Sequence, residues 1–339
     1  MENNVKTKIG INAEEKQNNK AQLKEKKKTE ALLKAEDISL SFIQYVSGLR
    51  QIELKVISNL SIEVHRGEIL AIVGSSGSGK SLLAHTILGI LPSNARLEGK
   101  IEYNGLELTQ EKKEELRGKE IALVPQSITY LDPLMRISDQ VIGCSEEKNE
   151  GLMRKLQKEI FKRYNLKPEV ETMYPHELSG GMTRRVLVST AVISSSKLII
   201  ADEPTPGLDE KTLNETLSHF RDLADKGCAV ILITHDIEAA LKISDKIAVF
   251  YAGTVLEVAN AEDFKNDGEN LRHPYTRALW NALPQNKFQA ISGHQPLLDE
   301  VTDGCIFYER CVKKNDICSK GIPQFKIING GTVRCNNVP

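Results

Sequence analysis

The feature that most constrains this chain is a glycine-rich run between two segments of different character. Gly74 to Ser81 reads Gly-Ser-Ser-Gly-Ser-Gly-Lys-Ser. The preceding residues, Glu68 to Gly74, are almost entirely apolar and predict a buried strand, whereas Ser81 to Gly89 predicts a helix. A strand, a glycine-rich turn and a helix in this order indicate a phosphate-binding loop, and they restrict the chain to α/β folds.

Each residue type in this run has a physical reason to bind a polyphosphate. Glycine permits unusual dihedral angles and a close approach of the backbone, and successive N–H groups at a helix start favour an anion. Lys80 is expected to contact the β- and γ-phosphates of a nucleotide, and the Ser81 hydroxyl is expected to ligate Mg²⁺. The other residues expected around the phosphates are Gly74, Ser75, Ser76, Gly77, Ser78 and Gly79.

A second apolar segment ends in two adjacent carboxylates, Asp202 and Glu203. We expect Asp202 to hold Mg²⁺, directly or through water. Glu203 is expected to act as the general base or to orient the attacking water. An acidic pair after a strand is weak evidence by itself. It becomes informative here because a phosphate-binding loop precedes it in the same chain.

The remaining pattern alternates strands with helices. The further predicted elements are buried strands over 120–125, 197–202, 229–234 and 246–251, and helices over 211–224 and 237–243. This alternation predicts a mostly parallel sheet that is covered on both faces. The charged stretch 145–173 is also expected to be helical. The chain has no internal repeat and is expected to hold one nucleotide-binding unit.

Composition divides the chain into three parts and excludes some functions. Residues 1–35 are dominated by Lys, Glu, Asn and Gln and predict a disordered tail. Residues 36–262 form the α/β domain, and residues 263–339 a small appended domain with a core too thin to fold without a staple. The formal net charge of -1, from 45 basic and 46 acidic residues, argues against a nucleic-acid partner.

The sequence also predicts a cytoplasmic chain. No apolar run approaches the roughly 20 residues that a bilayer-spanning helix needs. The polar start of the chain lacks the pattern of a secretory signal peptide. A role at a membrane would therefore depend on partner subunits.

Taken with these features, several short segments make residues 36–260 resemble the ABC (ATP-binding cassette) ATPase family. His176 to Met182 resembles the signature motif of the family, and Val124 to Gln126 resembles its glutamine loop. Leu208 and Asp209 resemble the D-loop, and Thr234 to Asp236 resemble the histidine switch. The resemblance implies an ATPase built as a P-loop NTPase cassette, with a RecA-like parallel-sheet core and a helical subdomain.

The resemblance further implies that two cassettes pair head to tail with ATP between them. Ser179, Gly180 and Gly181 of one cassette would face the γ-phosphate that is held by the other. These residues precede a predicted helix, so they also present an anion-receptive helix start, and Ser179 fits a simple helix N-cap as well. Asp209 would approach the nucleotide across the dimer.

Other roles within one cassette follow from the same resemblance. His235 would contact the γ-phosphate and position Glu203 and the water. Gln126 would reach Mg²⁺ and report the nucleotide state to a permease. The family stacks an aromatic side chain on adenine, and Phe42 and Tyr45 are the nearest aromatic residues upstream of the loop.

The segments His273 to Leu279 and Gly304 to Cys311 resemble the C-terminal domain of the oligopeptide, dipeptide and nickel importer subfamily. The region contains four cysteines separated by five, six and sixteen residues, namely Cys305, Cys311, Cys318 and Cys335. Structural zinc sites usually contain close cysteine pairs, which are missing from this set. Both the spacing and the resemblance favour a 4Fe–4S cluster; zinc and unliganded buried thiols are the alternatives.

These inferences lead to an importer ATPase at the cytoplasmic face of the cell membrane. Its expected partners are two permease subunits, an extracytoplasmic binding protein and a second, related cassette. Peptides are the expected cargo, and nickel or a metal chelate is the alternative. A soluble ABC ATPase of DNA repair or translation is the alternative from another class. Only 98 residues separate Lys80 from Ser179, too few for the long coiled coil of the repair proteins.

Overall fold

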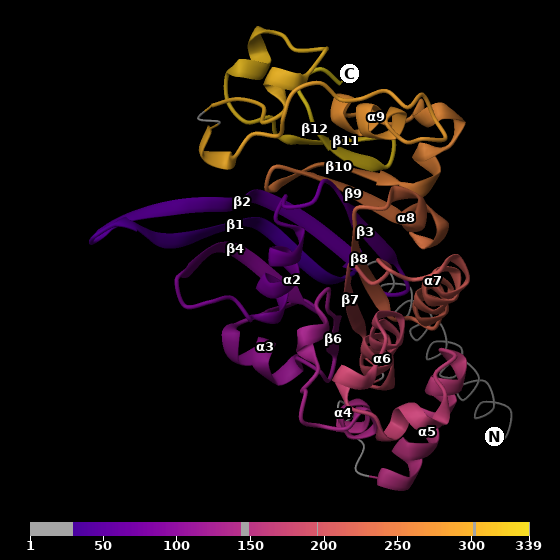
Figure 1. The fold of residues 1–339 in the computed structure, drawn as a ribbon. Helices are drawn as coiled ribbons and strands as arrows, with labels where there is room; N and C mark the ends of the chain where they lie inside the picture. Colours follow the sequence, from indigo (N-terminus) through magenta and orange to yellow (C-terminus); the bar gives the residue numbers. More distant parts are fainter. Residues whose placement is uncertain (1–29, 144–148, 195, 301–302, 339) are drawn as a thin grey trace, which may run out of the picture.

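The computed structural model describes residues 30–143, 149–194, 196–300 and 303–338 (Figure 1). Its main sheet has the strand order β11-β12-β10-β9-β3-β8-β7-β6. The strands from β9 to β6 are parallel, which confirms the predicted parallel core. These strands are β3 (Ile69–Val73), β6 (Ile121–Val124), β7 (Leu198–Asp202), β8 (Ala229–Thr234) and β9 (Lys246–Tyr251).

Alternate residues of β3 show how this sheet separates two apolar cores. Ile69, Ala71 and Val73 belong to the core shared with the helices on one face, and Leu70 and Ile72 to the core on the other face. All five side chains are fully buried, which is why the strand appears in the sequence as an unbroken apolar run. The helices that contribute to the first core include α6 (Gly180–Ile193), α7 (Glu210–Asp225) and α8 (Ile237–Ile243).

The second face is covered by α2 (Lys80–Leu88) and an antiparallel sheet of order β2-β1-β4-β5, which the sequence analysis did not predict. Its strands are β1 (Ala31–Ser47), β2 (Arg50–His65), β4 (Ala95–Tyr103) and β5 (Leu106–Glu107). Residues 31–35, predicted as part of the disordered tail, begin β1 because Leu32 and Leu33 are buried in the second core. Residues 1–29 of that tail lie outside the described residues.

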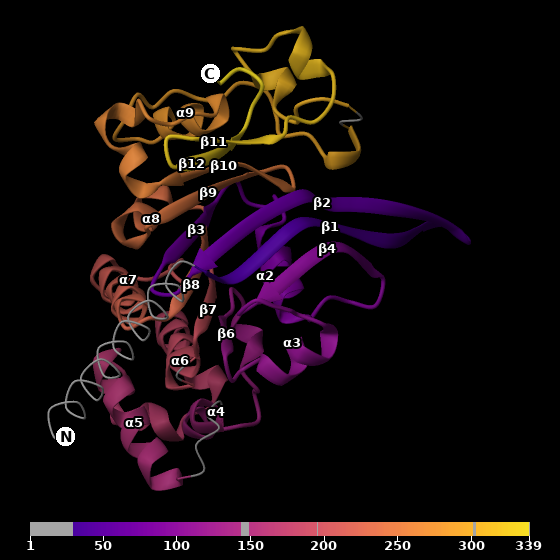
Figure 2. The ribbon, with the colours of Figure 1, turned by 180° about the vertical axis from the view of Figure 1, so that it is seen from behind.

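A helical subdomain lies beside β6, at the opposite end of the molecule from the C-terminal region (Figure 2). It contains α4 (Ile137–Gly143), α5 (Glu150–Arg163) and the short turns η2 (Pro168–Thr172) and η3 (Pro175–Glu177). A further helix, α3 (Gln110–Leu116), packs near α2. The predicted helical stretch therefore contains one long helix and a turn, apart from residues 145–148, which lie outside the described residues.

The C-terminal region continues the main sheet. Its last strand, β12 (Gly331–Arg334), pairs antiparallel with β10 (Thr254–Asn260), and β11 (Phe325–Ile328) forms the edge. Leu271 and Phe307 belong to the same buried cluster as the cassette helices. The region thus packs against the core of the cassette, and a separate appended domain with a thin core stays a prediction. Its other elements are η4 (Ala261–Phe264), η5 (Asn266–Gly268), α9 (Pro274–Asn281), η6 (Leu298–Glu300), η7 (Tyr308–Arg310) and η8 (Asp316–Ser319).

Candidate nucleotide site

Three segments that are distant in the sequence meet where the neighbouring parallel strands β3, β7 and β8 end. Ser81 Oγ, from the start of α2, donates a hydrogen bond of 3.1 Å to Asp202 Oδ1 at the end of β7. His235, directly after β8, places Nδ1 2.9 Å from Oε1 and 3.0 Å from Oε2 of Glu203. The structure thus brings together predicted site residues from all three segments.

The glycine-rich loop has the geometry that its sequence requires. Gly77 and Gly79 adopt φ values of +74° and +102°, which residues with a side chain rarely adopt. A Cβ atom at Gly74 would lie 2.3 Å from the carbonyl oxygen of Phe250, so only glycine fits there. The hydroxyl of Ser78 is buried without a hydrogen-bond partner among the described residues. The glycine-rich loop thus leaves polar groups, such as the Ser78 hydroxyl, available to bind an anion at the start of α2.

Lys80 places a positive charge inside this loop. Its Nζ donates hydrogen bonds of 3.0 Å to the carbonyl oxygen of Gly74 and 2.8 Å to that of Ser75. Burial lowers the pKa of Lys80, and the nearby carboxylates of Glu203 and Asp202 oppose that shift. The ammonium group is therefore buried next to the positions where a phosphate chain would bind.

Asp202 and Ser81 form an oxygen pair that suits a small divalent cation. Asp202 is 3% exposed, and burial raises the pKa of its carboxyl group, whereas the Ser81 hydroxyl lowers it. Mg²⁺ typically uses one or two carboxylates together with waters and substrate phosphates. One carboxylate and one hydroxyl beside a phosphate-binding loop fit that ion.

The backbone at Glu203 is held in a strained conformation. Its φ of +47° lies in the left-handed region, which is costly for a residue with a side chain. The Glu203 N–H donates to the carbonyl oxygen of Ile233 at 2.9 Å, and Arg184 Nη1 donates to the carbonyl oxygen of Glu203 at 3.0 Å. Strand β8 and helix α6 therefore fix this turn from two sides. Arg184 was not among the predicted site residues, because its contact depends on the packing of α6 against β7.

Other predicted site residues lie at the surface in a single chain. Ser179 Oγ accepts a hydrogen bond of 3.3 Å from the Met182 N–H and caps α6. Asp209 caps α7, accepting from the N–H and the hydroxyl of Thr212 at 3.0 and 2.6 Å. Ser179, Asp209 and Gln126 are exposed, and no hydrogen bond between described residues joins them to the glycine-rich loop.

Gly180 and Gly181 follow Ser179 as the first residues of α6 and have open space where a Cβ atom would lie. Two contacts of the site were not predicted. Ser75 Oγ donates to Oε1 of Gln295, a residue of the C-terminal region, at 2.7 Å. Tyr130 OH lies 3.3 Å from Nε2 of His85 on α2. Both link distant segments, so no local sequence signal could have found them.

Comparison with known proteins decides the family. Residues 57–206 match the family described as ABC transporter. The oligopeptide transport ATP-binding protein OppD of Escherichia coli is 33% identical over 321 residues, which cover 90% of this chain and 93% of that protein. This chain belongs to the ABC transporter family. ATP hydrolysis is the activity of its cassette, as the motifs predicted.

Other matches cover the cassette and the C-terminal region of this ABC chain. Residues 256–318 match the family described as the oligopeptide/dipeptide transporter C-terminal region. The dipeptide transport ATP-binding protein DppD of Haemophilus influenzae is 31% identical, and the match covers 90% of this chain and 95% of that protein. A dimeric bacterial ABC transporter cassette, MJ0796, superimposes with a TM-score of 0.60 at 25% identity, covering 68% of this chain and 98% of that one. These matches confirm the cassette fold.

The metal site expected in the C-terminal region of this ABC chain has no support in the structure. The Cys305 N–H donates to the carbonyl oxygen of Cys318 at 2.8 Å, so parts of the cysteine set do lie close together. Burial raises the pKa of the Cys305 thiol to about 11 and raises those of Cys311 and Cys335. Among the described residues, no group of three or more His, Cys, Asp or Glu side chains could hold a metal ion, which supports neither the 4Fe–4S cluster nor zinc.

Proposed function

We propose that this chain is the ATP-hydrolysing subunit of a peptide importer. The observation that carries the proposal is the combination of the two matches in one chain, the ABC transporter cassette and the oligopeptide/dipeptide transporter C-terminal region. Relatives that match over most of both chains are named as oligopeptide and dipeptide transport ATP-binding proteins. The chain would bind two permease subunits at the cytoplasmic face of the membrane, and an extracytoplasmic protein would deliver the peptide.

Hydrolysis would use the cluster at the ends of β3, β7 and β8. Asp202 and Ser81 would hold Mg²⁺, with Gln126 completing the site, and the ion would neutralise charge on the β- and γ-phosphates. Glu203 would accept a proton from the attacking water. The hydrogen bond of His235 to Glu203 supports a role in orienting that carboxylate. Lys80 would contribute its positive charge to the phosphates.

A second cassette would complete the nucleotide site. In one chain, Ser179 and Gly180 form an exposed helix start, where free N–H groups and the helix dipole favour an anion. Asp209 is also exposed at the start of α7. These residues could reach the γ-phosphate of a neighbouring cassette in a head-to-tail dimer. Whether that neighbour is a related chain, as we propose, is measurable by co-purification.

A candidate surface for the permease subunits follows Gln126 in the sequence. Tyr130, Leu134 and Met135 are 51%, 87% and 44% exposed, and clustered apolar side chains on a surface often mark a protein contact. Tyr130 also contacts His85 on helix α2, which supports a link between this surface and the nucleotide site.

Among the described helices, none has the length and apolar content needed to span a bilayer.

Uptake measurements test the proposed function. In cells that lack the chain, wild-type protein should restore uptake of labelled di- and oligopeptides, whereas the Glu203→Gln variant should not. Glu159→Gln, an exposed change on α5, is the matched control and should restore uptake fully. Restored nickel uptake without peptide uptake would show that the chain serves a metal importer and not a peptide importer. Fractionation with ribosomes or DNA in place of membranes would favour the soluble alternative.

A further inference from the structure

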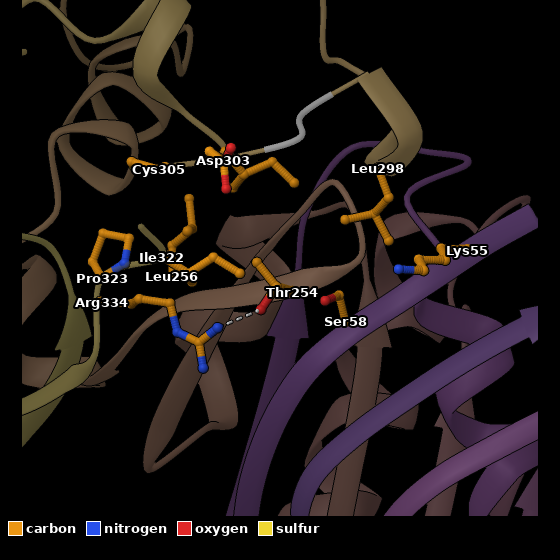
Figure 3. A pocket seen from close by; sticks show the side chains of 12 residues that line it. Lys55, Ser58, Thr254, Leu256, Leu298, Asp303, Cys305, Ile322, Pro323 and Arg334 are labelled. Carbon is orange, nitrogen blue, oxygen red and sulfur yellow. Dashed lines mark hydrogen bonds between the residues drawn. The ribbon is translucent and has the colours of Figure 1, made fainter. Parts of the chain in front are cut away.

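A cavity of about 160 Å³ lies between the cassette and the C-terminal region (Figure 3). Its walls come from β2, the start of β10, η6, the segment from Asp303 to Ile306, and the residues on either side of the β11–β12 hairpin. None of the residues 74–81 contributes to it. The cavity is therefore separate from the nucleotide site and belongs to no function described above.

Arg334 supplies a buried positive charge to this cavity. Its side chain is buried, with 6% exposed, and Nε has no hydrogen-bond partner among the described residues. Nη2 donates to the carbonyl oxygen of Asn59 at 2.8 Å, and Nη1 lies 3.4 Å from Thr254 Oγ1. The guanidinium lies 4.2 Å from the ring centre of Phe325, and no ion pair with a carboxylate is found in the described part of the chain. The carboxylate of Asp37 acts on this guanidinium at longer range without forming an ion pair with it. Arg334 therefore still contributes a positive potential to the cavity, which favours an anionic group.

Other polar groups of the cavity divide by charge. Lys55 on β2 extends towards the cavity beside the hydroxyl of Ser58 (Figure 3). Asp303 lines the wall that the C-terminal region provides, across the cavity from Lys55. Neither Lys55 nor Asp303 has an ion-pair partner among the described residues. The Lys55 ammonium and the Ser58 hydroxyl thus lie on one side of the space, the Arg334 guanidinium lies beside Thr254 on another side, and the Asp303 carboxylate lies on the wall from the C-terminal region (Figure 3).

The remaining wall is apolar and includes Leu256, Leu298 and Ile322. A small molecule with a carboxylate, an ammonium group and an aliphatic side chain would match all three parts of the lining. We propose that this cavity binds a free aliphatic amino acid such as leucine. Its carboxylate would face Lys55 and Ser58, and its ammonium group would face Asp303. A cavity of about 150 Å³ accommodates a benzene-sized molecule, so the volume suits one amino acid and excludes a longer peptide.

The proposed ligand would contact a segment that also reaches the phosphate-binding loop. Leu298 packs against the turn that precedes β10. Gly253 lies in that turn, and a Cβ atom added to it would lie 2.6 Å from Leu298 Cδ1. Three residues earlier, Gln295 accepts the hydrogen bond from Ser75. Amino-acid binding at Leu298 and nucleotide binding at Ser75 would therefore be coupled, and the coupling would be reciprocal. The binding proposal itself does not depend on the proposed import function.

Isothermal titration calorimetry on the purified full chain without nucleotide tests the proposal. L-leucine should bind with a stoichiometry of one. The analogues 4-methylpentanoate, which lacks the amine, and 3-methylbutylamine, which lacks the carboxylate, should each bind at least about tenfold more weakly, since each loses a charged hydrogen bond. Lys55→Met and Asp303→Asn should weaken leucine binding by a similar factor. Lys155→Met and Glu159→Gln, exposed changes on α5, are the matched controls and should leave it unchanged.

Three results would overturn the proposal. These are no heat with leucine at 10 mM, equal affinity for leucine and both analogues, or leucine binding that neither Lys55→Met nor Asp303→Asn affects. Binding of inorganic phosphate at this site in place of leucine would also overturn it, because an inorganic anion leaves Asp303 without a partner. Lys55 and Asp303 are exposed, so these variants should fold; their circular dichroism spectra and melting temperatures check this independently.

Discussion

The cassette and the C-terminal region share an apolar core, but the C-terminal region also contains a buried ionic cluster. The parallel strands of the cassette are buried through apolar side chains on both faces, a stabilisation that is spread over many residues. The C-terminal region adds Leu271 and Phe307 to that apolar core and is also joined to β10 by one buried ionic cluster. Arg272 Nη1 lies 3.3 Å from Glu257 Oε1 and 2.9 Å from Asp263 Oδ2, while Nε and Nη2 donate at 2.7 Å to the carbonyl oxygens of Ile328 and Asn329.

This difference determines how the stability of each region should respond when one residue is replaced. Glu257 is fully buried and accepts hydrogen bonds of 2.8 Å from the N–H groups of Arg272 and His273. One arginine therefore joins β10, the following turn and the β11–β12 hairpin. Replacing one apolar side chain in a large core removes only the share of the packing that this side chain contributes. Removing one partner of a buried ion pair leaves the other charge buried without compensation, which destabilises the structure more strongly. We therefore expect damage in the cassette to be graded and damage at Arg272 to be concentrated.

The largest expected effect separates chemistry from structure. Glu203→Gln should reduce ATP hydrolysis by at least about 100-fold, because removal of a general base typically costs 10²–10⁴ in rate. ATP binding and the melting temperature should change little. Phosphate release, measured with a companion cassette present, tests the rate. Undiminished turnover would remove Glu203 from the proposed role, and increased proteolysis of residues 263–338 would show that the change also disturbs the structure of the C-terminal region.

Breaking the ionic cluster should have the next largest effect. Arg272→Met leaves Glu257 and Asp263 unpaired and should destabilise the C-terminal region by about 3–5 kcal/mol. Limited proteolysis and hydrogen exchange should locate the change in residues 263–338, while nucleotide binding persists. Lys265→Met is the matched control, because it removes the exposed pair with Glu262 and should cost less than about 1 kcal/mol. Similar losses for the two variants would show that the cluster is not the anchor.

Acid should weaken both regions through one buried histidine each. Burial lowers the pKa of His219 in the cassette to about 4 and that of His273 in the C-terminal region to about 3, from an ordinary 6.5. Since the folded-state pKa lies below the unfolded one, the neutral ring stabilises the fold above pH 6.5. That stability is lost as the pH falls towards 4 and 3, at about 1.4 kcal/mol per pH unit for each histidine.

Urea unfolding at pH 7, 6 and 5 measures this dependence. His219→Gln and His273→Gln should each remove one histidine's share of the slope. Proteolysis at pH 5 should then show protection restored in the cassette by the first variant and in the C-terminal region by the second. A slope that neither variant changes would exclude both histidines as its source.

The smallest expected effect on stability comes from Asp202→Asn. This change should raise the stability of the chain while it removes the activity. Burial raises the pKa of Asp202 above 3.8, so the cost of its buried charge is absent at lower pH and grows as the pH rises. At pH 7 without nucleotide or Mg²⁺, Asp202→Asn should therefore stabilise the chain by about 0.5–2 kcal/mol. The same change should remove Mg²⁺-dependent hydrolysis. Thermal unfolding and phosphate release measure the two effects, and a lower melting temperature would contradict the assigned cost.

Sequence by itself determined the features that depend on local order. The glycine spacing of 74–81 needs positive φ values and a following helix, and unbroken apolar runs such as Ile69–Val73 indicate strands buried on both faces. These local patterns predicted the parallel core and the two carboxylates at the end of β7, whereas the role of His235 was implied only by the family resemblance. The antiparallel strands β1, β2 and β4 were missed, because each has a largely exposed part and the apolar pattern there is broken.

Only the tertiary structure decided which distant polar groups meet. Arg184 reaches Glu203, Gln295 reaches Ser75, and Arg272 joins Glu257 to the last hairpin, all through helix and strand packing that no local pattern encodes. It also decided that the cysteine region shares the cassette core and provides no metal-binding group among the described residues. The physical reason is that hydrogen bonds and ion pairs depend on distances of a few ångströms, and these distances are set only when the whole chain has packed.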